Sequence, residues 1–230
     1  MSTQNLTHLQ WHPSARLSVV GTLHETAVRT VPHIVKGTVA LSGGSTYSRL
    51  FERWGAMQPD CREASFFPVD ERRVPFDDSE SNWGTAYRRL LCRVGRSSDR
   101  DHYAQSAEAY EQVLRQGFPN WPPVFDTVFL GAGEDGHTAS LFPGETYLED
   151  TASVVLETVG HKPPVFRITL GPGVLMSARK LIGVVFGDRK GLIAAALVRG
   201  DRSLPFVRIL AGHPAPHIFV HRELLPRSAG

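Results

Sequence analysis

A histidine lies in a glycine-rich loop that follows an apolar run of the sequence. The loop reads G-A-G-E-D-G-H-T-A-S over residues 131–140, and its histidine is His137. Imidazole has an unperturbed pKa of about 6.5, which suits proton transfer at neutral pH, and Glu134 or Asp135 could orient the ring or stabilise its charged form. A structural histidine in an ordinary glycine turn is the alternative. The flanking acids and the position at a strand end favour catalysis.

A second glycine-rich segment, S-G-G-S-T at 42–46, separates an apolar run from a stretch with helical spacing. Gly43 and Gly44 let the backbone approach an anion closely, and Ser45 and Thr46 add hydroxyl groups. The N-terminus of the following helix supplies free N–H groups and a partial positive charge. A plain tight turn with a Ser/Thr cap remains open, because the segment matches neither common phosphate-binding motif.

Two acids and two arginines, D-E-R-R, occupy residues 70–73, again after an apolar run. We expect Asp70 and Arg72 to lie near the end of a strand, where an arginine can hold a phosphate or carboxylate with two parallel hydrogen bonds. For Asp77 and Asp78 a solvated turn is favoured, with Ser81 as the cap of the next helix.

Two further cations are candidates for binding an anion. Arg167 falls inside the β-like run V-F-R-I-T-L, where a buried charge is costly without a partner, so it is expected to reach an anion or an acid. Lys190 follows Gly187 and Asp188 at a helix start, and a solvated helix residue is its alternative interpretation.

The sequence gives little support for a metal or a redox-active centre. His213, His217 and His221 recur every four residues, but Pro214 and Pro216 prevent a helical zinc pair there. The two cysteines, at 61 and 92, do not form a C-x-x-C motif, and this favours a reducing compartment. We therefore predict no metal site and no cofactor.

Charge and hydropathy restrict the class of partner. The 230 residues include 25 Lys and Arg against 23 Asp and Glu, so the formal net charge is 25 − 23 = +2. Such a balance argues against nucleic acid as the main partner, and no apolar stretch is long enough to span a membrane. The polar N-terminus, 1–11, lacks a signal-peptide pattern. We expect a soluble, cytoplasmic protein that binds a small molecule, and the sequence leaves the oligomeric state open.

Strands and helices alternate along the chain, and Gly and Pro separate them. Apolar spacing from Leu17 to Val31 predicts a helix that stops near Pro32. Further helices are expected over 47–54, 82–94, 104–116 and 189–199, and strands over 38–41, 65–69, 125–130, 165–170, 181–186 and 217–220. The pattern predicts one α/β domain over residues 1–230, with a mainly parallel sheet and helices on both faces. Ligands bind such sheets beyond the carboxyl ends of the strands.

Four motifs together resemble the 6-phosphogluconolactonase family. They are A-L-S-G-G-S-T at 40–46, D-E-R-R-V-P with D-D-S-E-S-N within 70–82, G-A-G-E-D-G-H-T-A-S-L-F-P-G at 131–144, and K-P-P-V-F-R-I-T-L at 162–170. Their order and spacing match the family, and they span more than half of the chain. The resemblance implies a Rossmann-like fold of the sugar-phosphate isomerase type and no metal. It also implies hydrolysis of 6-phospho-D-glucono-1,5-lactone to 6-phosphogluconate in the oxidative pentose phosphate pathway.

The same resemblance assigns roles to individual residues. It makes His137 the general base that activates water, with Asp70 and Asp135 close to the reacting centre. The phosphate and polar parts of the substrate fall to the remaining candidates, which are Gly43, Gly44, Ser45, Thr46, Arg72, Arg167 and Lys190. Loop N–H groups around 133–137 are candidate donors to the developing oxyanion, and no G-x-S-x-G serine elbow is present.

Two positions depart from the family pattern, and two other functions stay open. Tyr47 stands where proline is common, and His221 stands where an aspartate often follows the last strand. An amino-sugar-phosphate isomerase or deaminase resembles the chain in its S-G-G-like and D-G-H segments, but those enzymes carry a glutamate where this chain has Phe142. A non-catalytic sugar-phosphate sensor is the third possibility, and the intact Asp70, Asp135 and His137 argue against it.

Overall fold

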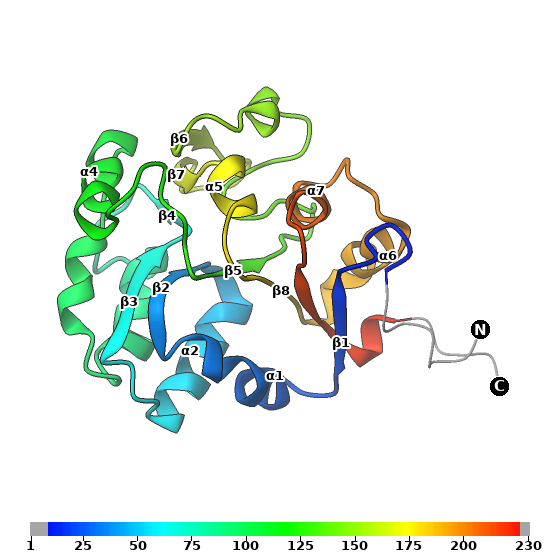
Figure 1. The fold of residues 1–230 in the computed structure, drawn as a ribbon, viewed down its shortest axis with the longest axis horizontal. Helices are drawn as coiled ribbons and strands as arrows, with labels where there is room; N and C mark the ends of the chain where they lie inside the picture. Colours follow the sequence, from blue (N-terminus) through cyan, green and yellow to red (C-terminus); the bar gives the residue numbers. More distant parts are fainter. Residues whose placement is uncertain (1–8, 226–230) are drawn as a thin grey trace.

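Six parallel strands form the main sheet of the computed structural model, which describes residues 9–225 (Figure 1). Their order is β1-β9-β8-β5-β2-β3, and every neighbouring pair is parallel. The strands are β1 (Arg16–Val20), β2 (Lys36–Leu41), β3 (Glu63–Pro68), β5 (Thr127–Gly131), β8 (Leu181–Val185) and β9 (His217–His221). This arrangement confirms the predicted α/β fold with a mainly parallel sheet.

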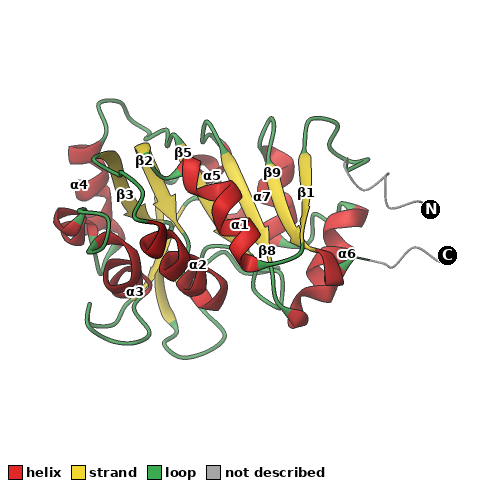
Figure 2. Ribbon diagram, turned by 90° about the horizontal axis from the view of Figure 1, so that it is seen from below, coloured by secondary structure: helices red, strands yellow, loops and turns green. Residues whose placement is uncertain are grey.

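Helices cover both faces of the main sheet. Figure 2 shows α1 (Leu23–Thr30), α2 (Gly44–Met57) and α3 (Asn82–Ala86) in front of it. The other face is covered by α4 (Ala107–Gly117), α5 (Pro172–Met176), α6 (Gly191–Arg199) and α7 (Pro205–Gly212). Short helical turns complete the chain: η2 (Val31–His33), the π-helical η3 (Tyr87–Leu91), η4 (Ser97–His102), η5 (Thr146–Glu149), η6 (Asp188–Lys190) and η7 (Arg222–Leu224).

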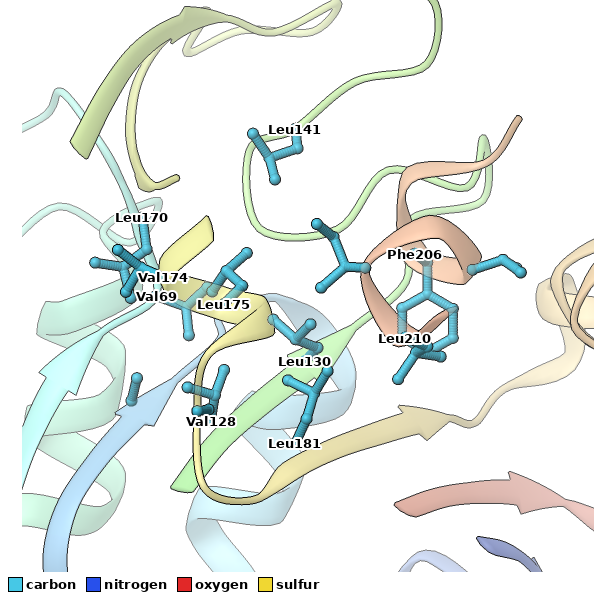
Figure 3. Packing of buried hydrophobic residues seen from close by; sticks show 14 of the residues in the cluster. Val69, Val128, Leu130, Leu141, Leu170, Val174, Leu175, Leu181, Phe206 and Leu210 are labelled. Carbon is cyan, nitrogen blue, oxygen red and sulfur yellow. The ribbon is translucent and has the colours of Figure 1, made fainter. Parts of the chain in front are cut away.

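Two hydrophobic cores lie on the two faces of the sheet, because successive side chains of a strand point to opposite sides. In β2, Val39 and Leu41 pack with α1 and α2, whereas Ala40 packs in the opposite core. Figure 3 shows the core on the side of Ala40. There Val128, Leu130 and Leu181 of the sheet contact Leu175 of α5 and Phe206 and Leu210 of α7. The long apolar runs of the sequence are therefore explained by burial on both faces.

A separate antiparallel sheet of three strands stands beside the carboxyl ends of the main sheet. It contains β4 (Asp70–Arg72), β7 (Phe166–Leu170) and β6 (Val155–Val159), in the order β4-β7-β6. The strand predicted over 165–170 exists as β7, but it does not belong to the parallel sheet. Val69 joins the two sheets, since its N–H donates to the Leu41 carbonyl and its carbonyl accepts from the Leu170 N–H.

The prediction of one helix from Leu17 to Val31 is wrong for its first six residues, 17–22. Residues 16–20 form β1, which pairs with β9 along its whole length. The helix starts at Leu23, where the Thr22 hydroxyl accepts a hydrogen bond from the Glu25 N–H. A T-x-x-E capping pattern at 22–25 was the sequence signal for this start.

The boundaries of the other predicted helices lie closer to the observed ones. The helix predicted over 82–94 starts at Asn82 behind the Ser81 cap, as expected, but widens into the π-helical turn η3 after Ala86. The helix predicted near 104–116 is α4, and α5 and α7 were not predicted. No helix among residues 9–225 is long and apolar enough to cross a membrane. Most of the polar N-terminal segment, 1–11, lies outside the described residues.

Successive strands are added to opposite sides of the sheet before and after the β2–β5 pair, so the order of the strands reverses at this point. From β2 the chain moves to β3 at one edge, whereas from β5 it continues to β8 and β9 on the other side. In open parallel sheets, ligands bind in the crevice that forms outside the carboxyl ends of the strands at such a point. The loop before α2 and the loop after β5 both start there.

Candidate active site

A pocket of about 650 Å³ opens at this crevice. Every residue that the sequence analysis proposed for the site lines it. The loop before α2 contributes Gly43, Gly44, Ser45 and Thr46, and the other loops and strands contribute Asp70, Arg72, Asp135, His137, Arg167 and Lys190. Segments that are more than 100 residues apart in the sequence are thus brought to one cavity.

His137 is held by a hydrogen bond to Asp135. The distance from His137 Nδ1 to Asp135 Oδ1 is 2.5 Å, and the His137 N–H also donates to the same oxygen at 3.2 Å. An ionised carboxylate only accepts hydrogen bonds, so Nδ1 carries the proton and Nε2 of the neutral ring is left as the basic atom. The hydrogen bond from His137 lowers the pKa of Asp135 to about 2. Asp135 is therefore charged at neutral pH.

Two further contacts fix the position of the His137 ring. A Cβ atom added to Gly133 would lie 2.2 Å from the ring atoms Cε1 and Nδ1, so only glycine leaves room for the ring. The ring of Phe142 lies 5.0 Å away, centroid to centroid, at an interplanar angle of 46°. The imidazole is consequently held from three sides, by Asp135, Gly133 and Phe142.

The N–H groups of the histidine loop are mostly used inside the loop. The Gly133 N–H donates to the His137 carbonyl at 2.7 Å, and the Gly136 N–H donates to the Gly133 carbonyl at 3.2 Å. With the His137 N–H bonded to Asp135, three of the expected donors to an oxyanion are occupied. Of the candidate donors around 133–137, those of residues 133, 136 and 137 are therefore engaged within the loop in this structure.

The N-terminus of α2 presents unused donors to the pocket. The first turn of a helix leaves its N–H groups without intrahelical partners, and no side chain of the described residues caps α2. Gly44 has a φ of +86°, which favours glycine, and Gly43 is covered by the Asn82 side chain, whose Oδ1 would lie 2.0 Å from an added Cβ. The two glycines thus serve a tight turn and a close contact, and the helix dipole faces the cavity.

Two arginines lie side by side on neighbouring strands of the smaller sheet. Arg72 of β4 and Arg167 of β7 are direct partners in the strand register. Burial, and then the charge of Arg72, lowers the pKa of Arg167. Nη2 of Arg167 donates to the Lys162 carbonyl at 3.2 Å, whereas its buried Nε has no hydrogen-bond partner among the described residues. An anion placed between the two guanidinium groups would relieve their repulsion.

Asp70 is the buried acid of this pocket. Its Oδ2 accepts a hydrogen bond from the Ser140 hydroxyl at 2.7 Å, and its carbonyl accepts from Asn82 Nδ2 at 3.1 Å. Ser140 follows the histidine loop, so its hydrogen bond connects that loop to β4. Asp70 therefore holds the two halves of the pocket together, whatever its part in the chemistry.

Glu71 supports the site from behind without lining the cavity. Its carboxylate accepts hydrogen bonds from three backbone N–H groups and from the Ser81 hydroxyl. The backbone donors are Arg72, Asn82 and Trp83. Burial nevertheless raises the pKa of Glu71 to about 7. Glu71 thus joins β4 to the start of α3 and positions the residues between them.

Lys190 and Thr46 line the side of the pocket next to β8. Lys190 Nζ donates to the Ala132 carbonyl at 2.7 Å, and burial lowers its pKa. The Thr46 hydroxyl donates to the Phe186 carbonyl at 3.3 Å. His221, at the position noted above, stacks on the Phe186 ring at 4.1 Å and does not line the pocket. The C-terminal strand therefore approaches this site through Phe186.

Several residues that line the pocket received no role from the sequence. They are Glu80, Asn82, Ser140, His161 and Lys162. All but His161 fall inside the motifs quoted above, so the motifs were found but the orientation of their polar side chains was not. His161 had no signal, because the strand β6 before it was not predicted. Among residues 9–225, no group of three or more His, Cys, Asp or Glu side chains is arranged to hold a metal ion.

Comparison with known proteins gives one consistent family. The family model of glucosamine-6-phosphate isomerases/6-phosphogluconolactonase matches residues 16–218. The chain is 35% identical to 6-phosphogluconolactonase of Rattus norvegicus over 180 residues, covering 72% of this chain and 70% of the rat protein. It is 37% identical to the Nostoc 6-phosphogluconolactonase over 164 residues, which are 66% of this chain and 68% of that protein.

Solved structures point to the same family as the sequence comparisons. The 6-phosphogluconolactonase from Trypanosoma brucei superposes with a TM-score of 0.75 and 29% sequence identity, covering 91% of this chain and 97% of that one. The fold, the motifs and the relatives all identify the same group. The chain belongs to the glucosamine-6-phosphate isomerase/6-phosphogluconolactonase family.

Proposed function

We propose that the chain is a 6-phosphogluconolactonase, which hydrolyses 6-phospho-D-glucono-1,5-lactone to 6-phospho-D-gluconate in the oxidative pentose phosphate pathway. One observation carries the chemistry: His137 donates from Nδ1 to Asp135 and keeps Nε2 basic, in a pocket that also contains two neighbouring arginines. Lactone hydrolysis needs a base for water and a cationic site for the phosphate.

In the proposed mechanism, His137 Nε2 takes a proton from a water molecule that attacks the lactone carbonyl carbon. Negative charge grows on the carbonyl oxygen, and the charged Asp135 stabilises the imidazolium that forms. Collapse of the tetrahedral intermediate breaks the bond to the ring oxygen, which receives the proton from the imidazolium. The product is a free carboxylic acid, which ionises, and a hydroxyl group.

The oxyanion and the phosphate need separate donors. Since three N–H groups of the histidine loop are already bonded, we assign the oxyanion to the free N–H groups at the start of α2 and to Lys190. We assign the phosphate to Arg72 and Arg167, whose side chains come from paired positions of the smaller sheet. The Ser45 hydroxyl remains available for a sugar hydroxyl, and the Thr46 hydroxyl, which donates to the Phe186 carbonyl, can still accept a hydrogen bond from one.

Phe142 argues against the deaminase alternative. Opening a pyranose ring and moving protons between carbons requires an acid-base relay, to which the glutamate of the deaminases would contribute. In this chain that position is Phe142, whose ring contacts His137. A phenyl ring can neither accept the imidazole N–H nor hold a proton. Lactone hydrolysis does not require that relay.

The test is an assay of purified protein with freshly generated 6-phosphogluconolactone, in which acid release is compared with spontaneous hydrolysis. The same protein concentration is assayed with glucosamine 6-phosphate for release of ammonia and fructose 6-phosphate. We expect lactone hydrolysis well above the spontaneous rate and no amino-sugar turnover. Acid release at the spontaneous rate, or amino-sugar turnover of comparable speed, would contradict the proposal.

A further inference from the structure

Arg72 is already engaged by an acid of its own chain. Its Nη1 contacts the Glu80 carboxylate and donates to the Glu80 carbonyl at 3.1 Å. Both side chains line the pocket, and they are 27% and 50% exposed. The Glu80 carboxylate thus already binds the guanidinium group that the proposed function assigns to the substrate phosphate.

The turn that carries Glu80 is well anchored. The Glu80 N–H donates to Asp78 Oδ1 at 2.7 Å, and the next residue, Ser81, donates its hydroxyl to Glu71 at 2.9 Å. Because Glu71 also binds the N–H of Arg72, the acid and the arginine are held to the same buried carboxylate. The proximity of Glu80 and Arg72 is therefore a feature built by the backbone and not a chance contact of two long side chains.

We propose that Glu80 is an intramolecular competitor that weakens phosphate binding at Arg72 and so promotes release of the product. This inference rests on the proposed function. Substrate binding must displace the Glu80 carboxylate, which then returns to Arg72 when the ligand leaves. An exposed ion pair contributes little, so displacement remains easy for a phosphate dianion.

Product release is the step that needs such help. Hydrolysis converts the uncharged lactone group of the substrate into a carboxylate, so the product carries one more negative charge than the substrate and is attracted more strongly by the cations of the pocket. A nearby carboxylate that repels the product and takes back one arginine opposes this retention. Glu80 thereby sets affinity without touching the reacting atoms.

The test is the affinity of Glu80→Gln for 6-phosphogluconate, measured by titration calorimetry at low salt. Glutamine keeps the shape of the side chain and removes its charge. We expect the variant to bind the product about twofold to fivefold more tightly than the parent protein, the gain that loss of one competing surface ion pair allows. Product inhibition of lactone hydrolysis should strengthen by the same factor.

The matched control is Glu52→Gln. Glu52 and Arg89 form a similar ion pair, with side chains 47% and 41% exposed, and neither residue lines the pocket. This variant should bind the product as the parent does. A second control repeats Glu80→Gln in an Arg72→Ala background, where the gain should disappear because the competition acts through Arg72.

Unchanged or weaker binding by Glu80→Gln would overturn the inference, because Glu80 would then be a residue that merely orients Arg72. Persistence of the gain without Arg72 would also overturn it. Calorimetry does not depend on turnover, so the two proposals can fail separately. A parent protein that binds 6-phosphogluconate but hydrolyses no lactone contradicts the proposed function, whereas an active parent with no gain in Glu80→Gln contradicts only this inference. Failure of both proteins to bind the product would overturn this inference alone, because there would then be no retained product for Glu80 to release.

Discussion

One nitrogen atom, Nε2 of His137, carries the proposed chemistry, and its environment was only partly visible in the sequence. The flanking acids predicted a hydrogen-bonded histidine, and Asp135 makes that bond. The sequence did not show that Glu134 instead pairs with Arg189, at 2.9 Å. The two adjacent acids of this loop, Glu134 and Asp135, both carry a carboxylate, and the path of the backbone decides which carboxylate meets the imidazole.

Replacing His137 by glutamine tests the base. We expect kcat to fall by roughly 10²–10⁴-fold, because the general base is removed while the volume of the side chain is nearly kept. The measurement is steady-state lactone hydrolysis with subtraction of the spontaneous rate. The thermal midpoint serves as control for folding. Near-normal turnover in a folded variant would show that another group activates the water.

Arg167→Ala tests the binding of the phosphate. The unpaired Nε in the pocket predicts a direct contact with the substrate, so its loss should weaken binding by about 1.5–3 kcal/mol, which raises KM roughly tenfold to hundredfold. The matched control is Arg73→Ala, since Arg73 lies next to Arg72, is exposed, and pairs with Glu157 away from the pocket. Equal KM values for the two variants would refute the assignment.

Among the secondary-structure elements, the strand ends of the main sheet were the most predictable part. Short β-branched runs followed by glycine marked the ends of β2 and β5, and the candidate residues after them do meet in one pocket. The smaller sheet was not predictable in the same way. Its strand β4 has only three residues, all charged, and it forms because β7 pairs with it and because Glu71 is buried among backbone donors.

The carboxyl group of Glu71 should make stability depend on pH. Burial raises the pKa of Glu71 from the usual 4.5 to about 7, so between these values the native state binds more protons than the unfolded state. The free energy of unfolding therefore falls as pH rises through this window, by up to about 3 kcal/mol from this group. Below pH 4.5 the contribution is fully present.

Chemical denaturation between pH 5 and 8 measures this effect. The difference in unfolding free energy between the parent protein and Glu71→Gln should shrink as pH increases, because glutamine does not titrate. A pH-independent difference would mean that the four hydrogen bonds to the carboxylate compensate for its burial and that its pKa in the native state is ordinary.

For the chain taken together, the composition predicted a protein with a large core and a small-molecule partner, and the pocket and the family agree with this. A single domain over residues 1–230, a cytoplasmic location and the absence of a nucleic-acid partner stay predictions. We propose the single domain because Val69 bonds both sheets through its own backbone, to Leu41 on one side and to Leu170 on the other. Sequence periodicity could not show this link, since it depends on the backbone groups of one residue.

One cooperative unfolding transition is the expected consequence. Tryptophan fluorescence reports mainly on Trp54 and Trp83, which are buried in the core shared by α2 and α3, while far-ultraviolet circular dichroism reports on all helices and strands. The two signals should give the same denaturation midpoint. Separate midpoints would show that the sheets unfold independently and that the chain has two cooperative units.

The division of the pocket between two sheets also bears on how its substrate range can change. His137 and the start of α2 lie on loops of the parallel sheet, whereas Arg167, His161 and Lys162 belong to the hairpin of β6 and β7. The hairpin meets the histidine loop at Phe142, whose ring lies 5.1 Å from His161 and 5.0 Å from His137. Insertions or replacements within 160–165 therefore change the hairpin side of the pocket, which selects the anion, and leave the sequence of the histidine loop as it is. New lactone specificities can then evolve, or be selected from a library, by changes in this one segment.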